Sequence, residues 1–409
     1  MSMRQDCDTI VRDAIARVLP DEAVKRALAG KIFSAGRLIL VAAGKAAWTM
    51  ARTAYEVLGT RINDGIVITK YDHSRGAIGN LSIYEAGHPV PDENSFRATA
   101  QALSLTENLT ADDTVLFLLS GGGSALFELP EISPEELQDI TRQLLACGAD
   151  IVEINTIRKR ISRVKGGRFA AHCAPAKVET VVLSDIIGDP LDMIASGPAY
   201  PDSSTCADAL HIAEKYHLSL SSAAQRCLQR ETPKSLDNIH TVVTGSVREL
   251  CRAAAEACTK LGYVPTILTD SLSCEARDAG YRLAALAQTH RADGKCAYIA
   301  GGETVVHLTG SGKGGRNQEL ALAAAEGIAG LANVAVFSVG SDGTDGPTDA
   351  AGGYVDGKTA ARLTAQGISV ADVLQRNDAY HALLQVDGLI VTGPTGTNVN
   401  DVAVVLINT

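Results

Sequence analysis

A glycine-rich turn follows one of the strands that the sequence predicts. Three consecutive glycines let backbone N–H groups converge on an anion without steric cost, and a helix that starts there adds a favourable dipole. Ligands of open α/β sheets gather at the carboxyl ends of strands, so we favour a phosphate cradle over a merely flexible turn. The turn does not match the P-loop pattern. It directly follows the strand expected at 114–119 and consists of Ser120, Gly121, Gly122, Gly123 and Ser124.

Lys45 follows another expected strand, at 37–42, where the chain turns into a helix. A lysine in this position can neutralise a phosphoryl group during its transfer. The alternative is a solvated lysine at the start of a helix. Because a cation is unfavourable at a helix N-terminus, its presence there mildly supports a function.

The segment 158–168 is rich in basic residues in a chain whose net charge is −10. Such a cluster in an acidic protein suggests a site for a carboxylate or a phosphate. The alternative is a solvated helix face, which would account for about half of these residues. The basic residues are Arg158, Lys159, Arg160, Arg163, Lys165 and Arg168.

The stretch 310–319 (GSGKGGRNQE) formally contains G-x-G-x-x-G between a strand and a helix, which is typical of dinucleotide binding. The acid expected about 20 residues further on is missing from the end of the next strand. Cations inside the turn, Lys313 and Arg316, suit a phosphoryl group better than a close-packed pyrophosphate. A flexible surface loop is the alternative. We therefore predict a phosphate-binding turn that includes Lys313, Gly314, Gly315 and Asn317.

Acidic residues follow a strand in the segment 341–349, which holds Asp342, Asp345 and Asp349. Phosphoryl transfer needs carboxylates to hold magnesium and to accept the proton of the attacking hydroxyl. Turns use the same residue types, so a purely structural role is the alternative. We predict that Asp342 and Asp345 bind metal, and that Asp349 is a turn residue. Asp185 and Asp189 form a similar acidic turn earlier in the chain.

Short apolar strands alternate with helical stretches along the whole chain, which predicts a mostly parallel α/β fold. The polar, helical region 203–238 suggests a boundary, giving domains at 1–235 and 236–409. We expect the last two strands, 389–392 and 402–407, to pair around the turn between them. The other strands are expected at 65–69, 178–183, 240–243, 265–268, 296–300 and 334–339.

Composition excludes several classes of protein. The negative net charge disfavours nonspecific binding to nucleic acid or anionic membranes. No apolar stretch reaches the roughly 20 residues that span a bilayer, and the N-terminus reads as an amphipathic helix without a secretory core. The nine cysteines include no C-x-x-C pair, and zinc-ligand spacing is absent. These features favour a cytoplasmic protein with reduced thiols.

Six sequence blocks together resemble the glycerate kinase family whose C-terminal half is called the MOFRL domain. They run in order along nearly the whole chain, which makes them far more specific than any one turn. The blocks are LLSGGGSALFELP, INTIRKRISRVKGGRFA, VVLSDIIGDPLDMIASGP, GSGKGGRNQELALA, SVGSDGTDGPTDAAGG and GPTGTNVNDV.

The resemblance implies two α/β domains, the first Rossmann-like, with an active site in the cleft between them. It implies a glycerate 2-kinase that uses ATP and Mg²⁺ to phosphorylate the 2-hydroxyl of D-glycerate. Lys45 and Arg316 then become catalytic cations, and Asp185 and Asp189 become catalytic or metal-binding acids. The implied partners are D-glycerate and a nucleotide, without nucleic acid or membrane, and a homodimer remains open. Relatives labelled hydroxypyruvate reductase supply the alternative, an NAD(P)H-dependent reductase.

Overall fold

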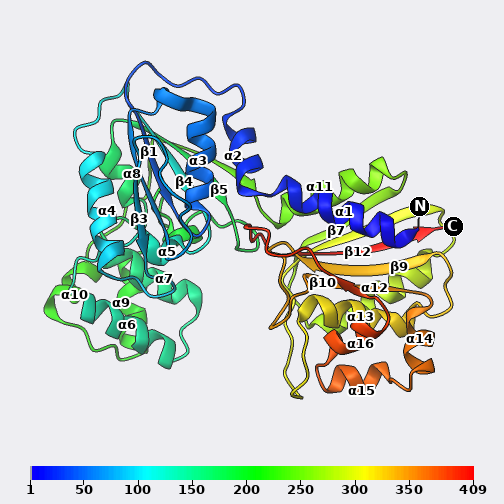
Figure 1. The fold of residues 1–409 in the computed structure, drawn as a ribbon. Coiled ribbons are helices and arrows are strands. Elements are labelled where there is room, and N and C mark those ends of the chain that lie inside the picture. The colour runs from blue at the N-terminus through cyan, green and yellow to red at the C-terminus, as the bar shows by residue number, and fades with distance from the viewer. Residues whose placement is uncertain (1) are drawn as a thin grey trace. The chain divides into compact units, whose positions relative to one another are not determined.

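The computed structural model describes residues 2–409, which divide into two compact units (Figure 1). The parallel-sheet unit consists of residues 23–183 and 189–244. The mixed-sheet unit consists of the residues up to 22, a short segment at 184–188, and residues 245–409. Each unit is built around its own six-stranded sheet.

The sheet of the parallel-sheet unit has the strand order β3-β2-β1-β4-β5-β6, and the strands from β3 to β5 pair in parallel. This order is characteristic of Rossmann folds, which confirms the predicted fold class. Strands β1 and β4 are buried at every residue, as expected for parallel strands that helices cover on both faces. The strands are β1 (Leu38–Ala43), β2 (Asp64–Lys70), β3 (Ser82–Ala86), β4 (Thr114–Leu119), β5 (Lys177–Leu183) and β6 (Ile239–Gly245).

The helices of this unit fall into two groups. The first group accompanies the sheet, and Leu38, Leu40 and Ala42 of β1 share one apolar cluster with α2 and α3. The second group, α6, α7, α9 and α10, has an apolar cluster of its own (Figure 1). The helices are α2 (Pro20–Leu28), α3 (Ala47–Leu58), η1 (Gly59–Arg61), α4 (Glu93–Leu105), α5 (Gly123–Leu126), α6 (Pro134–Ala146), α7 (Ile151–Arg160), α8 (Arg168–Cys173), η2 (Ile194–Ser196), α9 (Cys206–Lys215) and α10 (Ser222–Leu228).

The sheet of the mixed-sheet unit has the order β11-β10-β9-β12-β8-β7. Within this sheet only β7 and β8 pair in parallel, and β12 runs antiparallel to both β8 and β9. The strands are β7 (Val264–Leu272), β8 (Lys295–Gly302), β9 (Val334–Gly340), β10 (Gly352–Asp356), β11 (Leu389–Ile390) and β12 (Asp401–Asn408).

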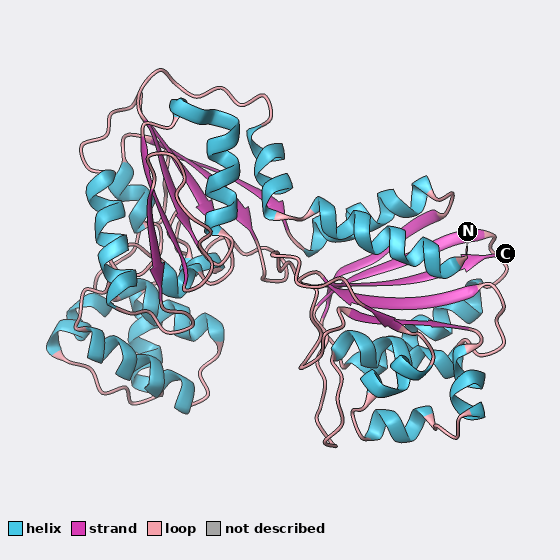
Figure 2. Ribbon diagram, in the orientation of Figure 1, coloured by secondary structure: helices cyan, strands magenta, loops and turns pink. Residues whose placement is uncertain are grey.

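Helices cover both faces of this second sheet (Figure 2). Alternate residues of β12 enter opposite apolar clusters: Val402, Val404 and Leu406 lie with α1 and α11, whereas Ala403, Val405 and Ile407 lie with α12 and α13. Burial on both faces explains why the strand is an unbroken apolar run. The helices are α1 (Met3–Arg17), α11 (Val247–Lys260), α12 (Ala276–His290), α13 (Arg316–Gly327), α14 (Thr359–Ala365), α15 (Val370–Gln375) and α16 (Ala379–Gln385). Among the described helices, none is long and apolar enough to cross a membrane.

The two units divide the chain differently from the expected boundary at residue 235. Helix α1 belongs to the mixed-sheet unit because Cys7, Ile10 and Ala14 pack in one cluster with α11 and the sheet. The later division falls between Thr244 and Gly245, at the end of β6.

The expected pairing of the last two strands is wrong. Strand β11 pairs with β10 at the sheet edge, whereas β12 lies centrally between β8 and β9. A two-residue strand offers too few hydrogen bonds to hold an eight-residue partner, and the apolar run of β12 gains more by burial on both faces.

Candidate active site

Two predicted turns of the parallel-sheet unit lie together at the carboxyl ends of β1 and β4. These strands are neighbours in the sheet, and the strand order reverses between them. The backbone N–H of Lys45 donates to the carbonyl of Gly121 at 2.9 Å, and the hydroxyl of Ser120 accepts from the N–H of Ala46 at 3.0 Å. Rossmann-type sheets bind ligands at this topological switch point.

The glycine-rich turn has backbone N–H groups that are free to donate to an anion. Gly122 has a φ of 86°, and a Cβ there would lie 3.0 Å from the ring of His88 and 3.2 Å from Cγ of Lys45. Within residues 2–409 the N–H groups of Gly121 and Gly122 have no hydrogen-bond partner. The helix that follows, α5, has only four residues, so the expected dipole is small and the backbone N–H groups provide most of the anion affinity.

Positive groups surround this turn in an otherwise acidic protein. Lys45 is exposed, and its carbonyl lies 3.1 Å from Nδ1 of His73. Burial, followed by the positive charges of Lys45, Lys70 and His73, lowers the pKa of His88. The neutral form of the His88 imidazole is therefore favoured. The positive charges of Lys45 and Lys70, which cause part of this shift, would attract a negative ligand to the turn.

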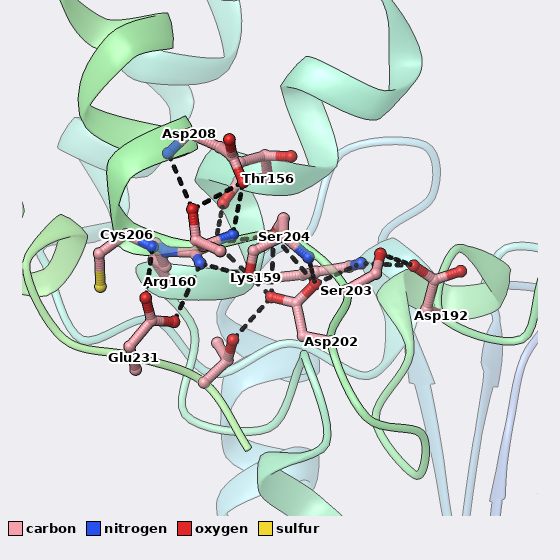
Figure 3. Close-up of polar contacts among 12 residues, drawn as sticks. Thr156, Lys159, Arg160, Asp192, Asp202, Ser203, Ser204, Cys206, Asp208 and Glu231 are labelled. Atoms are coloured by element: carbon pink, nitrogen blue, oxygen red, sulfur yellow. Dashed lines mark hydrogen bonds and ion pairs between the residues drawn. The ribbon is translucent and has the colours of Figure 1, made fainter. Parts of the chain in front are cut away.

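Most of the basic segment 158–168 serves internal ion pairs, and Figure 3 shows two of its members directed at the buried Asp202. Nζ of Lys159 lies 3.0 Å from Asp202, and Arg160 lies 3.5 Å from the same carboxylate. The other two pairs are Lys165 with Glu128 at 2.9 Å and Arg168 with Glu131 at 2.8 Å. Neither an anion site nor a solvated face describes these four residues.

In the mixed-sheet unit, the turn before α13 also presents free backbone donors. Lys313 donates its N–H to Oδ1 of Asp378 at 3.0 Å, and its Nζ lies 4.3 Å from the ring centre of Tyr380. The next three N–H groups, those of Gly314, Gly315 and Arg316, have no partner among the described residues. Together with the N-terminus of α13, they form an arrangement that suits a phosphate.

Arg316 is held by two carboxylates that the sequence reasoning did not select. Its Nε lies 2.5 Å from Oδ2 of Asp401, and its Nη1 lies 2.9 Å from Oε1 of Glu303. Burial raises the pKa of Asp401, and Arg316 opposes this shift. Its Nη2 also donates to Oδ1 of Asp401 at 3.1 Å, so all three guanidinium nitrogens contact a carboxylate and the group has a fixed position.

The predicted metal ligands lie in different surroundings. Oδ1 of Asp345 accepts from the N–H of Asn317 at 3.1 Å, and Oδ2 accepts from that of Gln318 at 2.8 Å. Burial raises the pKa of Asp345 to about 6. Asp342 accepts one hydrogen bond, from the N–H of Thr344 at 2.9 Å. The part of the chain that the structure describes contains no group of three or more metal-ligating side chains.

Close packing explains the glycine at position 315. A Cβ there would come within 2.3 Å of Cγ of Asp345, so a larger residue would push the carboxylate off the helix. Asp349 is exposed and accepts from the hydroxyl of Tyr380 at 2.8 Å, and its role as a turn residue stays a prediction.

The two other predicted acids are divided between the units. Asp185 belongs to the mixed-sheet unit, and its carbonyl accepts from Nδ2 of Asn400 at 3.2 Å. Asp189 belongs to the parallel-sheet unit and has a φ of 51°. Its Oδ1 is buried without a hydrogen-bond partner among the described residues, which leaves an unused acceptor.

Sequence reasoning missed His88, Glu303 and Asp401. Asp401 was within reach, because it closes the block GPTGTNVNDV at the start of an apolar strand. His88 and Glu303 carry no comparable local pattern. Their roles depend on contacts with Gly122 and Arg316, which are distant in the sequence.

A Rossmann-type sheet whose switch point presents free backbone donors beside a lysine, together with a second α/β unit that has a cationic turn, is the arrangement expected of enzymes that handle phosphorylated ligands. The model of a domain of unknown function, DUF4147, matches residues 6–229, and the MOFRL family model matches residues 296–401. The chain belongs to the glycerate kinase family that combines these two regions.

Individual relatives match along the whole chain. The D-glycerate 2-kinase of Thermotoga maritima is 52% identical over 99% of both chains, and the glycerate 2-kinase of Pyrococcus horikoshii is 40% identical over 100% of this chain and 98% of its own. A putative hydroxypyruvate reductase of Agrobacterium vitis is 38% identical over 91% of this chain and 100% of its own. The crystal structure of the Thermotoga maritima glycerate kinase superimposes with a TM-score of 0.95, covering 99% of each chain.

Proposed function

We propose that this protein is an ATP-dependent D-glycerate 2-kinase that produces 2-phosphoglycerate and ADP. The observation that carries the proposal is the hydrogen-bonded pair of turns at the switch point, with Lys45 beside the unpaired N–H groups of Gly121 and Gly122. The 52% identity to a D-glycerate 2-kinase supports the same reaction.

Phosphoryl transfer depends mainly on positioning and on charge stabilisation. The 2-hydroxyl oxygen of D-glycerate bonds to the γ-phosphorus while the bond to the β,γ-bridging oxygen breaks, and ADP leaves. Lys45 and the two glycine N–H groups stabilise the charge on the transferred oxygens. In the mixed-sheet unit, Arg316 and the N–H groups of Gly314 and Gly315 bind phosphate oxygens.

A carboxylate must accept the proton of the attacking hydroxyl. Asp189 is our first choice, because its buried Oδ1 has no donor among the described residues and its unit also contains Lys45. Asp185 is the second choice, four residues earlier in the same acidic turn. The two assignments predict that Asp189→Asn lowers kcat more than Asp185→Asn.

The reaction implies Mg²⁺, and the fit of the predicted ligands differs. Asp342 fits well, since it is partly exposed and its Oδ2 has no hydrogen-bond donor among the described residues. An Asp401 oxygen lies on the same side of Gly340 as Asp342, so Asp401 is a further candidate. The Asp345 oxygens already accept backbone donors, and its metal role stays a prediction. When bound, the ion would neutralise charge on phosphate oxygens.

A dinucleotide-dependent reductase receives less support. The turn after β1 is Ala43-Gly44-Lys45-Ala46, which has one glycine, whereas the Rossmann fingerprint needs three. A lysine in that turn suits a phosphoryl group that carries high negative charge.

The test is a product analysis. The protein is incubated with ATP, Mg²⁺ and D-glycerate, and the products are identified by mass spectrometry and phosphorus NMR. We expect ADP and 2-phosphoglycerate. A second reaction contains NADH and hydroxypyruvate. Oxidation of NADH without any ADP in the first reaction would contradict the proposal and establish the reductase.

We also propose that the protein works in the cytoplasm. All nine cysteines are free thiols and six of them are buried, which fits a reducing compartment. Labelling of the thiols in intact cells before lysis would test this, since a substantial oxidised fraction would contradict it. The homodimer stays a prediction that sedimentation can test.

A further inference from the structure

Arg158 on α7 differs from its basic neighbours. Lys159, Arg160, Lys165 and Arg168 all form ion pairs, but no carboxylate in residues 2–409 lies within ion-pair distance of Arg158. Its Nε is buried and makes no hydrogen bond to any described residue. A partly buried guanidinium with unused donors costs free energy unless an anion binds to it.

The guanidinium lies at the end of the glycine-rich turn. Its Nη2 is 3.4 Å from the carbonyl of Ser124, the last residue of that turn. The hydroxyl of Ser124 is 3.1 Å from the hydroxyl of Ser196, which in turn donates to Oδ1 of Asn155 at 2.9 Å. Asn155 and Arg158 are three residues apart on α7 and therefore share one face of the helix.

Two of these neighbours can donate to a bound anion. Within residues 2–409 the only partner of Nδ2 of Asn155 is the sulfur of Met193 at 3.9 Å, which is a weak acceptor. Because Ser196 donates its one proton to Asn155, the Ser124 hydroxyl is the donor to Ser196, and it can rotate to donate to a ligand instead. These donors lie beside Arg158, as the binding of a carboxylate requires.

The backbone that carries Ser196 is strained. Ala195, Ser196 and Gly197 are consecutive residues with φ values of 51°, 62° and 64°. Backbone N–H groups of Gly166 and Gly167 hold this turn by donating to the carbonyls of Ser196 and Gly197, at 3.0 and 2.7 Å. Strained backbone persists where the surroundings fix it, and it gathers at binding sites.

We propose that Arg158 binds the carboxylate of the hydroxy-acid substrate, with Ser124 as a second contact, and so selects acids over neutral polyols. This inference rests on the proposed kinase function. A guanidinium matches a carboxylate through two parallel hydrogen bonds. A nucleotide phosphate offers the same anionic chemistry. We favour the carboxylate because Lys45 and the free N–H groups of Gly121 and Gly122 already serve a phosphoryl group in this unit.

The experiment compares Arg158→Met and Arg158→Lys with Arg163→Met. Arg163 is the matched control, since it is exposed and belongs to the same basic segment. In Arg158→Met the KM for D-glycerate should rise about tenfold to a hundredfold, while the KM for ATP stays within about twofold. The KM of Arg158→Lys for D-glycerate should lie between those of Arg158→Met and the wild type, because lysine keeps the positive charge but cannot form two parallel hydrogen bonds to a carboxylate.

A neutral substrate distinguishes binding from structural damage. The ratio of kcat/KM for D-glycerate to that for glycerol should fall in Arg158→Met by the factor found for the KM, because glycerol lacks the carboxylate. A merely structural role would lower both values together, and this result would overturn the proposal. Circular dichroism and thermal unfolding verify that each variant folds.

The remaining outcomes separate this inference from the function on which it rests. If Arg158→Met turns over D-glycerate at the wild-type rate and with an unchanged KM, the inference is overturned and the proposed function is not affected. A selective rise in the KM for ATP would assign Arg158 to the nucleotide and also overturn it. A wild type that forms no ADP from D-glycerate would overturn the proposed function, and with it the inference.

Discussion

At the scale of single residues, Lys45 and Lys177 are exposed lysines at opposite ends of the same parallel sheet. Lys45 follows the carboxyl end of β1, whereas Lys177 begins β5. Because only the first position faces the proposed phosphoryl group, Lys45→Met should lower kcat by about a hundredfold or more. Lys177→Met should leave kcat unchanged. Steady-state kinetics with D-glycerate measure the kcat of both variants. Near-normal turnover in Lys45→Met would show that Lys45 is a solvated lysine without a catalytic role.

Arg316 combines a proposed catalytic role with a structural one. Arg316→Ala should lower kcat by about a hundredfold and should also lower the free energy of unfolding by about 1–3 kcal/mol, since it leaves the buried carboxylate of Asp401 without its partner.

A double variant separates the two roles. Arg316→Ala combined with Asp401→Asn removes the orphaned charge, so stability in urea should recover while activity stays low. Recovery of both would show that Arg316 acts only through Asp401. Arg282→Ala, an exposed arginine on α12, is the control for the loss of a positive charge.

At the residue level, the sequence suggests a candidate where a turn directly follows its own strand. Lys45 follows one expected strand, and Gly121 and Gly122 follow another, so each turn could be proposed as an anion site from its local pattern. The basic segment 158–168 could not be interpreted in this way. Its ion-pair partners lie between 33 and 71 residues away in the chain, and a sequence pattern cannot show whether a cation is paired.

At the scale of elements, the cationic turn before α13 is tied down by a loop from another part of the same unit. Oδ1 of Asn377 accepts from the N–H groups of Thr309 and Gly310 at 2.7 and 2.9 Å, and its Nδ2 donates to Glu319 of α13 at 3.2 Å. The buried side chain of Asn377 thus connects the segment that precedes the turn with helix α13, which follows the turn.

Asn377→Ala should loosen this segment without unfolding the unit. We expect the amide protons of Thr309 and Gly310 to exchange roughly fivefold to a hundredfold faster, which corresponds to the loss of hydrogen bonds worth about 1–3 kcal/mol. Hydrogen exchange measured by mass spectrometry reports on this peptide directly. Asn333 is exposed, and its side chain makes no hydrogen bond to any residue in 2–409, so Asn333→Ala should leave the exchange unaltered.

The cap that Asp345 provides for α13 should make stability depend on pH. Burial raises the pKa of Asp345 to about 6, above the value of about 3.9 for a free aspartate. The native state therefore binds the proton more tightly, and stability falls as pH rises through this window. Between about pH 4 and pH 6 the free energy of unfolding should fall by roughly 2–3 kcal/mol more than in Asp345→Asn.

Urea unfolding in metal-free buffer measures the free energy of unfolding of the wild type and of Asp345→Asn at each pH. If the two proteins depend on pH in the same way, the raised pKa of Asp345 is contradicted. Asp401 also has a raised pKa, and its charge helps to raise that of Asp345, so the difference between the two proteins includes the interaction of the two carboxyls.

Sequence patterns located elements more reliably than partners. The strand expected at 114–119 coincides with β4, and most others agree within two residues at an end. The pairing of β11 with β12 failed because adjacency in the sequence suggested a hairpin. The unbroken apolar run at 402–407 was the better guide, since it predicts burial on both faces and hence a central strand.

At the scale of the whole molecule, each unit has an apolar core that can be weakened separately. Ile10 of α1 is fully buried in the mixed-sheet unit, and Ile140 of α6 is fully buried in the parallel-sheet unit. Each substitution to alanine should cost about 2–5 kcal/mol. In scanning calorimetry, Ile10→Ala should lower the unfolding transition of the mixed-sheet unit, and Ile140→Ala that of the other.

Limited proteolysis assigns the transitions to the units. After Ile10→Ala the early cleavages should fall within residues 245–409, although the altered residue lies near the opposite end of the sequence. Early cleavage confined to residues 23–183 would show that α1 supports the other unit.

The position of α1 also orders events at the ribosome. This helix is synthesised before the strands and helices that cover its apolar face, which begin only at residue 245. At about 5–20 residues per second, synthesis of the intervening 222 residues takes roughly 10–45 s. Throughout that interval the apolar face with Ile10 and Ala14 lacks the helix α11 and the strands that cover it in the folded unit, while the parallel-sheet unit is completed. During this interval the nascent chain therefore presents an amphipathic segment whose apolar face is uncovered, and a chaperone that binds such faces is expected to recognise it.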